Sequence, residues 1–230
     1  MNRKLLTLLL AATALTAACD DDDDNTGPEG ESRVRVVHAS PDAPAVDVLL
    51  DDAEVLSDVS YLGASDYLET TDGEHNLKVN VAGTTTTAID ADVTLADGTD
   101  YTVIASDLVA QIAPIVLEDD NSAPTAGSVR VRAIHGAPSA PAVDVYVTAP
   151  GADLATATPA LTGVEFGDVS SYLEVPAGDY QVRVTPAGTK TVAIDSGALT
   201  LSGGQVRTVI AVDAAGGGGP FDFLVLADLN

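Results

Sequence analysis

Apolar and polar residues alternate in short stretches along most of the chain, and Gly, Pro and Asp separate these stretches. Successive side chains of a strand point to opposite faces of a sheet, so this alternation predicts β-strands with one buried face. No ten-residue window carries the apolar stripe of an amphipathic helix. In the first half of the chain the pattern predicts strands near residues 33–38, 45–50, 66–70, 76–81, 87–95, 101–106 and 112–118. Seven strands in about 90 residues are typical of an antiparallel β-sandwich.

The pattern occurs twice. Residues 33–48 match residues 130–145 at a constant offset of 97 positions, and later matches have offsets of 105 and 106. Insertions fall in loops, so the second copy contains a longer connection near residues 148–167. The sequence therefore predicts two tandem sandwiches with a polar linker between them. The expected boundaries are 32–119 for the first sandwich, 120–127 for the linker and 128–230 for the second sandwich.

The turn before a strand of the second copy bears on the topology. Residues 175–184 read Val-Pro-Ala-Gly-Asp-Tyr-Gln-Val-Arg-Val. This segment is similar to the turn and strand of immunoglobulin-like sandwiches, in which a Tyr just after the turn packs back on it. Transthyretin-like sandwiches use a similar turn, so both topologies remain open.

The N-terminus has the features of a secretory signal. Arg3 and Lys4 precede eleven mostly apolar residues. This run is too short to cross a bilayer, because a membrane-spanning helix needs about 20 residues. Residues 15–19 read Leu-Thr-Ala-Ala-Cys and resemble a bacterial lipobox, in which the Cys becomes lipidated and forms the mature N-terminus. Thr16 departs from the aliphatic residue usual at its position. We expect a signal peptide at 1–18 and lipidation of Cys19; an ordinary secretory signal with a chance Cys is the alternative.

An acidic segment follows Cys19. Residues 20–24 are all Asp, and the stretch to Glu31 has no apolar periodicity. Like charges repel and extend such a chain, so residues 19–31 are expected to form a tether. Its extended length is about 40 Å at 3.3–3.6 Å per residue. The segment does not specify which membrane the lipid enters.

Composition excludes several classes of function. The chain has 35 acidic and 10 basic residues among 230, a net charge of −25, and is 46% hydrophobic, which favours a folded acidic protein. Nucleic acid binding requires clustered Lys and Arg, so it is not expected. The single Cys excludes an intramolecular disulfide. No Trp occurs among nine aromatic residues, which argues against broad stacking platforms for sugars or bases.

The repeated block Val-His-(Ala/Gly)-(Ser/Ala)-Pro-x-Ala-Pro-Ala-Val-Asp-Val begins at Val37 and at Ile134, where Ile replaces the Val. Together with the Tyr-Leu-Glu turn and the Ala-Gly-Thr strand, it resembles the bacterial domain of unknown function 4397. The resemblance implies a secreted or lipid-anchored protein with tandem domains. It implies no established activity.

His38 and Asp47 recur as His135 and Asp144, and a His-Asp pair can orient a general base or begin a metal site. Strand parity places each His at the end of an inward apolar row, so a buried ring bonded to the adjoining Pro-rich turn is the structural interpretation. A nucleophile is also missing, because the second copy has no Ser equivalent to Ser40 and no Gly-x-Ser-x-Gly motif occurs. We expect no hydrolase activity.

Six of the basic residues fall at matched positions with outward parity. They are Arg33 with Arg130, Arg35 with Arg132, and Lys78 with Arg183. Asp47 and Asp144 share this parity, so we expect cross-strand ion pairs on an exposed sheet face, such as Arg35 with Asp47. A small cationic site for an anionic sugar or polymer is the functional alternative.

Carboxylates also cluster in turns. Asp51 and Asp52 form one such pair, and weak calcium binding at about 10⁻⁴–10⁻³ M is one interpretation. Solvated turns without a metal are the other, and no cofactor is expected.

Two classes of function follow. The first is a non-enzymatic lipoprotein of the bacterial cell envelope, a tethered rod of two sandwiches that acts in binding, adhesion or as a spacer, with an envelope protein or a glycan as partner. The alternative is a metal-dependent glycan-binding protein or hydrolase that uses the turns at His38 and His135. The pattern leaves the oligomeric state open.

Overall fold

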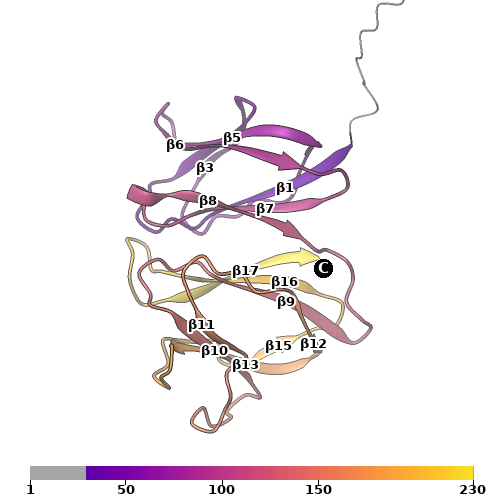
Figure 1. Ribbon diagram of the computed structural model, residues 1–230, viewed down its shortest axis with the longest axis vertical. Coiled ribbons are helices and arrows are strands. Elements are labelled where there is room, and N and C mark those ends of the chain that lie inside the picture. The colour runs from indigo at the N-terminus through magenta and orange to yellow at the C-terminus, as the bar shows by residue number, and fades with distance from the viewer. Residues whose placement is uncertain (1–29, 230) are drawn as a thin grey trace, which may run out of the picture.

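Residues 30–229 are described by the computed structural model, and they form two β-sandwiches stacked along the longest axis of the molecule (Figure 1). The expected signal peptide, Cys19 and most of the expected tether lie outside the described residues. Within residues 30–229, no helix has the length and apolar character needed to span a membrane.

The first sandwich contains eight strands. One sheet has the strand order β4-β1-β7-β8 and the other β3-β2-β5-β6. A short 3₁₀ turn, Val109–Gln111, lies between the last two strands. The strand bounds are β1 (Glu31–His38), β2 (Val46–Leu50), β3 (Ala53–Val59), β4 (Leu68–Thr71), β5 (Gly73–Val81), β6 (Thr87–Leu95), β7 (Asp100–Ser106) and β8 (Ala113–Asp119).

The second sandwich repeats this arrangement. Its sheets have the orders β12-β9-β16-β17 and β11-β10-β13-β14, and β15 pairs with another part of β13. The strand bounds are β9 (Ser128–His135), β10 (Val143–Thr148), β11 (Leu161–Val164), β12 (Leu173–Pro176), β13 (Gly178–Pro186), β14 (Ile194–Asp195), β15 (Leu199–Leu201), β16 (Val206–Val212) and β17 (Asp222–Leu229).

The predicted class, all-β with tandem sandwiches, is confirmed. Each sandwich also contains one parallel pair that the sequence did not indicate, β1 with β7 and β9 with β16. The remaining strand pairs are antiparallel. A parallel pair needs a long connection, which here contains the strands of the opposite sheet and one edge strand of the same sheet, β4 or β12.

Strand β3 (Ala53–Val59) is the strand of the first sandwich that the alternation did not predict. Most of its residues are exposed, so no apolar row marks a buried face. Its hairpin with β2 turns at Asp51 and Asp52, whose φ angles are 52° and 64°. Two consecutive positive φ angles define the type I′ turn that favours Asn, Asp or Gly, so the acidic pair is a structural turn signal.

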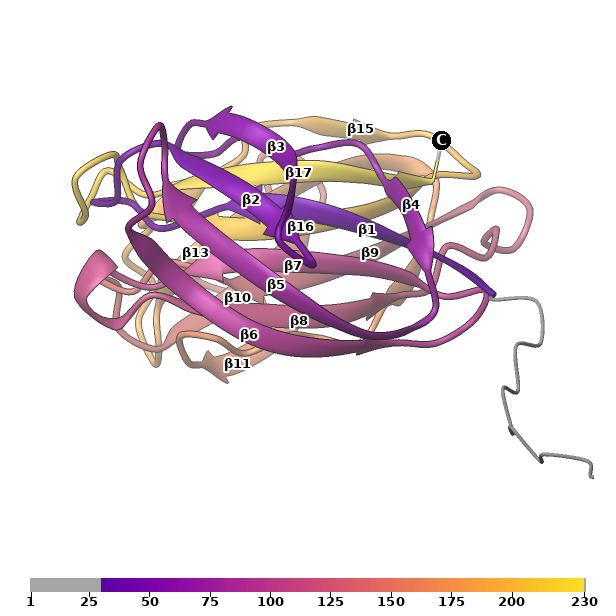
Figure 2. The same cartoon turned by 90° about the horizontal axis from the view of Figure 1, so that it is seen from above.

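The two sandwiches pack through sheet faces, giving a stack of four sheets (Figure 1). Viewed from above, the strands of the two sandwiches overlie one another (Figure 2). The sheets β4-β1-β7-β8 and β12-β9-β16-β17 are the inner pair and share one apolar cluster. Along β1, Val36 joins the core of its own sandwich, whereas Val37 joins the cluster between the sandwiches. Because β7 is covered on both faces, each of its residues is buried.

This stacking differs from a rod of domains joined end to end, because the strands run across the long axis (Figure 1). It positions the candidate residues at two places. The recurring His residues lie at strand ends of the inner sheets, and the outward side chains of those sheets lie between the sandwiches.

Candidate functional site

His38 is fully buried at the end of β1. Its Nε2 lies 3.0 Å from the carbonyl oxygen of Pro44, and the backbone N–H of Ser40 donates to its Nδ1 at 3.3 Å. An accepting Nδ1 and a donating Nε2 define a neutral ring. Burial lowers the pKa of His38, and the hydrogen bond to Pro44 only partly offsets this. The ring is therefore held neutral against the turn that follows β1.

His135 has the same arrangement in the second sandwich. Its Nε2 lies 3.2 Å from the carbonyl oxygen of Pro141, and the N–H of Ala137 donates to Nδ1 at 3.4 Å. Phe166 packs edge-on against this ring, as Tyr61 does against His38. Both His residues thus form the hydrogen bonds expected of the structural interpretation.

Asp47 bonds to backbone rather than to a cation. The N–H groups of Asp58 and Gly83 donate to its two carboxylate oxygens, each at 2.8 Å. These hydrogen bonds hold the pKa of Asp47 below its usual value. The register of β2 and β3 shifts here, and Asp58 has a φ of 55°, so a bulge turns the Asp58 N–H toward the carboxylate.

Asp144 repeats this geometry. Gly163 and Gly188 donate their N–H groups to its two oxygens at 2.9 and 2.8 Å. Gly163 has a φ of 61° and lies at the equivalent register shift between β10 and β11. The repeated His and Asp residues therefore do not form His-Asp pairs, because each His uses both ring nitrogens on backbone groups and each Asp binds backbone of neighbouring turns.

Within residues 30–229, no three His, Cys, Asp or Glu side chains converge as metal ligands. Weak calcium binding by turn carboxylates remains a prediction.

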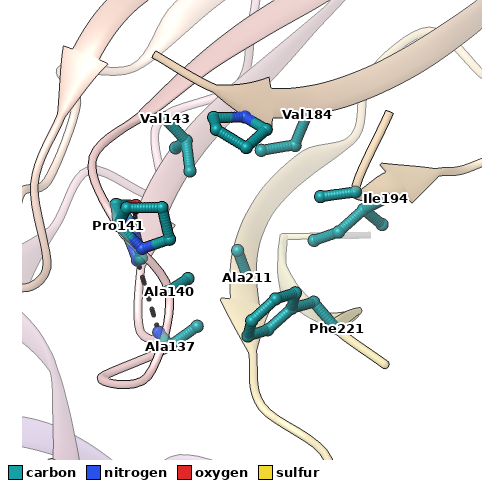
Figure 3. Close-up of a pocket in the computed structure, with 11 residues that line it drawn as sticks. Ala137, Ala140, Pro141, Val143, Val184, Ile194, Ala211 and Phe221 are labelled. Carbon is teal, nitrogen blue, oxygen red and sulfur yellow. Dashed lines mark hydrogen bonds between the residues drawn. The ribbon is translucent and has the colours of Figure 1, made fainter. Parts of the chain in front are cut away.

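An apolar pocket lies beside His135 (Figure 3). Val143, Val184, Ile194 and Phe221 surround it, and its volume is about 40 Å³. Ligand pockets usually measure about 300–1,000 Å³, so this space fits little more than one small group.

A polar cluster that the sequence did not reveal lies between the two sandwiches. Six side chains form a closed ring of hydrogen bonds, three from each sandwich. We call it the arginine–aspartate ring; its members are Arg35, Thr102, Asp119, Arg132, Thr208 and Asp228.

The first half of the ring begins at Arg35. Its Nη2 donates to Asp228 of the second sandwich at 2.6 Å, and its Nε donates to Thr102 at 3.1 Å. The Thr102 hydroxyl donates to Asp119 at 2.5 Å. The Arg35 side chain is 3% exposed and the two carboxylates are fully buried, so these charges are shielded from water.

The second half mirrors the first. Arg132 donates to Asp119 of the first sandwich and, through Nε, to Thr208 at 3.1 Å. The Thr208 hydroxyl donates to Asp228 at 2.6 Å, which closes the ring. Two guanidinium groups and two carboxylates balance each other. Each buried charge has the paired, hydrogen-bonded surroundings that it needs.

A Tyr ring covers each arginine of the ring. The guanidinium of Arg35 lies 4.8 Å from the centre of the Tyr67 ring, and that of Arg132 lies 4.7 Å from the centre of the Tyr172 ring. The Tyr67 hydroxyl donates to Asp119 at 2.6 Å. Burial is the main cause of the raised pKa of both phenols. The Tyr residues of the two Tyr-Leu-Glu motifs, Tyr67 and Tyr172, thus pack against the arginines of this polar cluster.

The expected pairing of Arg35 with Asp47 is wrong. The parity of Arg35 is as expected, pointing away from the core of its own sandwich, but the second sandwich covers that face. Asp47 lies in the other sheet. The signal available in the sequence was the matched positions of Arg35 and Arg132, with Asp119 near the end of the first copy.

The outer matched cations form local ion pairs. Arg33 pairs with Asp100 at 2.5 Å, Lys78 pairs with Asp52 at 2.5 Å, and Arg130 pairs with Asp120. Arg183 instead donates to Thr148 and to the carbonyl oxygen of Ala152. Arg33, Lys78 and Arg130 are therefore paired within the chain, whereas the buried Nε of Arg183 has no hydrogen-bond partner among the described residues.

The sequence profile of a family described as a domain of unknown function, DUF4397, matches residues 32–146 and 147–230. The chain belongs to this family. The resemblance noted from the repeated block is thereby confirmed. The division between the two matched segments falls inside β10, whereas the sheets divide between Asp119 and Ser128. A search of curated proteins found no match.

Three solved structures resemble the fold distantly. The Bacillus anthracis TIE protein is 11% identical with a TM-score of 0.26; the match covers 79% of this chain and 33% of that protein, so the chain spans about a third of its length. An α-glucan-binding streptococcal virulence factor is 12% identical, with 79% and 92% coverage and a TM-score of 0.25. A family 26 carbohydrate-binding module from Eubacterium rectale, solved with maltoheptaose, is 14% identical, with 84% and 96% coverage and a TM-score of 0.25.

Proposed function

We propose that this chain is a non-enzymatic lipoprotein of the bacterial cell envelope, anchored through a lipid on Cys19. Its two stacked sandwiches form one rigid head that acts in binding, adhesion or as a spacer. The observation that carries this proposal is that the repeated candidate residues are all engaged in structural hydrogen bonds. Both nitrogens of His38 and both oxygens of Asp47 bond to backbone.

The burial of both repeated His residues supports the non-enzymatic part. A general base needs an accepting nitrogen that a substrate can reach. His38 has a relative exposure of 0% and His135 of 2%. The pocket beside His135 is apolar and small.

The rigid head follows from the contact between the sandwiches. Buried apolar residues of both inner sheets share one cluster, and the arginine–aspartate ring lies beside it. The members of this apolar cluster are Val37, Ala39, Ile104, Ile134, Ile210, Val212 and Leu226. Burial of the apolar residues stabilises the contact between the sandwiches, and the paired buried charges fix the orientation of one sandwich on the other. A head of fixed shape suits a spacer or a presenting module.

The test of this proposal compares the soluble form that lacks residues 1–25 with its His38→Ala/His135→Ala variant. We expect no turnover of ester, peptide or glycoside substrates by either protein. We also expect any envelope protein or glycan that binds the wild type to bind the variant equally, once both are shown to be folded by circular dichroism. Turnover or binding that is present in the wild type and lost in the folded variant would support the alternative, a His-dependent enzyme or glycan-binding site.

The anchor is tested separately on the full chain expressed in a bacterium. Mass spectrometry should find a lipid on Cys19, and a Cys19→Ser variant should lack it and leave the membrane fraction. An unmodified Cys19 in the wild type would contradict the anchor and leave the rest of the proposal standing.

A further inference from the structure

The two inner faces carry the same side chains at equivalent positions. Arg35 corresponds to Arg132, Thr102 to Thr208, and Asp119 to Asp228. Their contacts are reciprocal. The Nη1 atom of Arg35 donates to the carbonyl oxygen of Ala227 at 3.0 Å, and that of Arg132 donates to the carbonyl oxygen of Glu118 at 3.0 Å. The sandwiches are therefore related by an approximate two-fold axis through the arginine–aspartate ring.

Reciprocal contacts of this kind are those of an isologous dimer, in which one patch binds a second copy of itself. Each inner face contributes one arginine and one aspartate to the contact. The arginine of each face forms an ion pair with the aspartate of the other face. The apolar residues of the two faces also correspond, because Ile104 packs in the shared cluster where Ile210 is its equivalent. Nothing in these contacts requires the partner face to belong to the same chain.

We propose that the inner face is a homotypic interaction surface and that its partner is a second copy of this chain. In the resulting dimer, the first sandwich of each chain packs on the second sandwich of the other. Each interface then contains one complete arginine–aspartate ring. All buried charges remain paired, so the exchange creates no unpaired charge. This inference is independent of the lipid anchor and of the proposed function.

The length of the linker determines whether the two sandwiches of one chain pack on each other, which we call the closed chain, or pack on those of a second copy. A short linker holds its two domains at an effective concentration of about millimolar, so a dilute chain closes on itself. The N-terminal end of the linker contacts both sandwiches: Asn121 donates to Asp100 of the first sandwich, and Asp120 pairs with Arg130 of the second. The dimer therefore becomes populated either near millimolar protein or when the linker cannot span the closed geometry.

The length that closure requires follows from the contacts. Arg132 lies four residues into β9 and contacts Glu118, so the chain must run back about 13 Å along the strand and cross about 10 Å between sheets. The direct distance from Asp119 to Ser128 is thus roughly 16 Å. Deleting residues 122–127 leaves three Cα steps, which span at most about 11 Å.

The test uses the chain without residues 1–25 and its deletion of residues 122–127. We expect light scattering to give the deletion variant twice the mass of one chain, with an unchanged β circular dichroism spectrum. A control in which Gly and Ser replace residues 122–127 at the same length should stay monomeric. Adding Arg35→Ala and Arg132→Ala to the deletion should raise the dimer dissociation constant at least 100-fold. A folded, monomeric deletion variant would overturn the proposal.

A second measurement on the unaltered linker decides the case in which the deletion variant fails to fold. Two differently tagged wild-type chains are unfolded together in urea, refolded over a series of concentrations up to about 1 mM, and measured by native mass spectrometry. We expect mixed-tag dimers whose fraction rises with refolding concentration. Their absence across the whole series would overturn the proposal.

Discussion

Arg35 in the first sandwich donates a 2.6 Å hydrogen bond to Asp228 in the second, 193 residues further along the chain. The Asp228 side chain is fully buried and the Arg35 side chain is 3% exposed. A buried arginine and a buried aspartate stabilise a structure only when each keeps its partners, and here Thr102 and Thr208 provide further hydrogen bonds. This contact fixes how the two sandwiches lie on each other.

Removal of Arg35 tests the strength of this contact. Arg35→Ala leaves the buried Asp228 carboxylate without its arginine, so the free energy of unfolding should fall by about 3–5 kcal/mol. Urea denaturation measures the change. Arg33→Ala, two residues earlier on the same strand, is the matched control, because the Arg33 side chain is half-exposed and its pair with Asp100 should contribute less than about 1 kcal/mol. Equal losses in the two variants would mean that the ring is not a special contact.

The apolar part of the interface gives a second prediction. Ile210 is fully buried and packs in the cluster between the sandwiches. Ile210→Ala should lower the free energy of unfolding by about 2–5 kcal/mol, because it leaves a cavity. Val225→Ala is the control, since Val225 on the neighbouring β17 is 57% exposed and should change stability by less than about 0.5 kcal/mol. A loss at Ile210 no larger than at Val225 would show that the face is open in solution.

His75 makes stability of the first sandwich depend on pH. Its Nδ1 lies 2.6 Å from a carboxylate oxygen of Asp51 and its Nε2 lies 2.9 Å from the carbonyl oxygen of Thr71. Both partners are acceptors, so both ring nitrogens carry a proton. Burial alone lowers the pKa of His75, but the hydrogen bonds to Asp51 and Thr71 outweigh it and the pKa is raised.

The sign of the effect follows from that raised value. A folded-state pKa above the unfolded value of 6.5 stabilises the fold fully below about pH 6.5, and this contribution is lost as the pH rises through the folded value. The second sandwich has Tyr180 at the equivalent position, and its hydroxyl donates to the carbonyl oxygen of Pro176. We expect His75→Tyr to abolish the loss of stability that the wild type shows as the pH rises above 6.5, as measured by thermal melts. A variant with the wild-type pH profile would contradict the assignment.

Asp47 should act in the opposite direction. The N–H groups of Asp58 and Gly83 favour its charged form and lower its pKa. The contribution of Asp47 to the stability of the fold is therefore present above the usual carboxyl pKa of 3.8. It is lost as the pH falls through the lowered pKa of the folded state. Asp47→Asn should melt at a lower temperature than the wild type at pH 7, and this difference in melting temperature should narrow as the pH falls from 3.8 through the lowered pKa. A gap that is constant with pH would show that the charge of Asp47 plays no part.

The sequence predicts the strands and their buried faces well, because alternation records which side chains point inward. It places Val36 and His38 on the core side of β1 and Arg35 on the other side. It does not record what covers that other side. The partner of Arg35 lies 193 residues away, and neither local spacing nor the repeat offset joins them.

Two further features have local causes that alternation does not express. Strand β3 is an exposed edge strand, so its residues show no apolar row. The bulge at Asp58 redirects a backbone N–H toward Asp47, and a one-residue shift of this kind depends on backbone angles that the pattern of polar and apolar residues does not encode.

Differential scanning calorimetry of the chain without residues 1–25 tests the central claim, that the two sandwiches form one rigid body. The account predicts a single transition in which the calorimetric and van't Hoff enthalpies agree. The Arg35→Ala/Arg132→Ala variant should separate into two transitions of smaller enthalpy. Two independent transitions in the wild type, unchanged in that variant, would contradict the account.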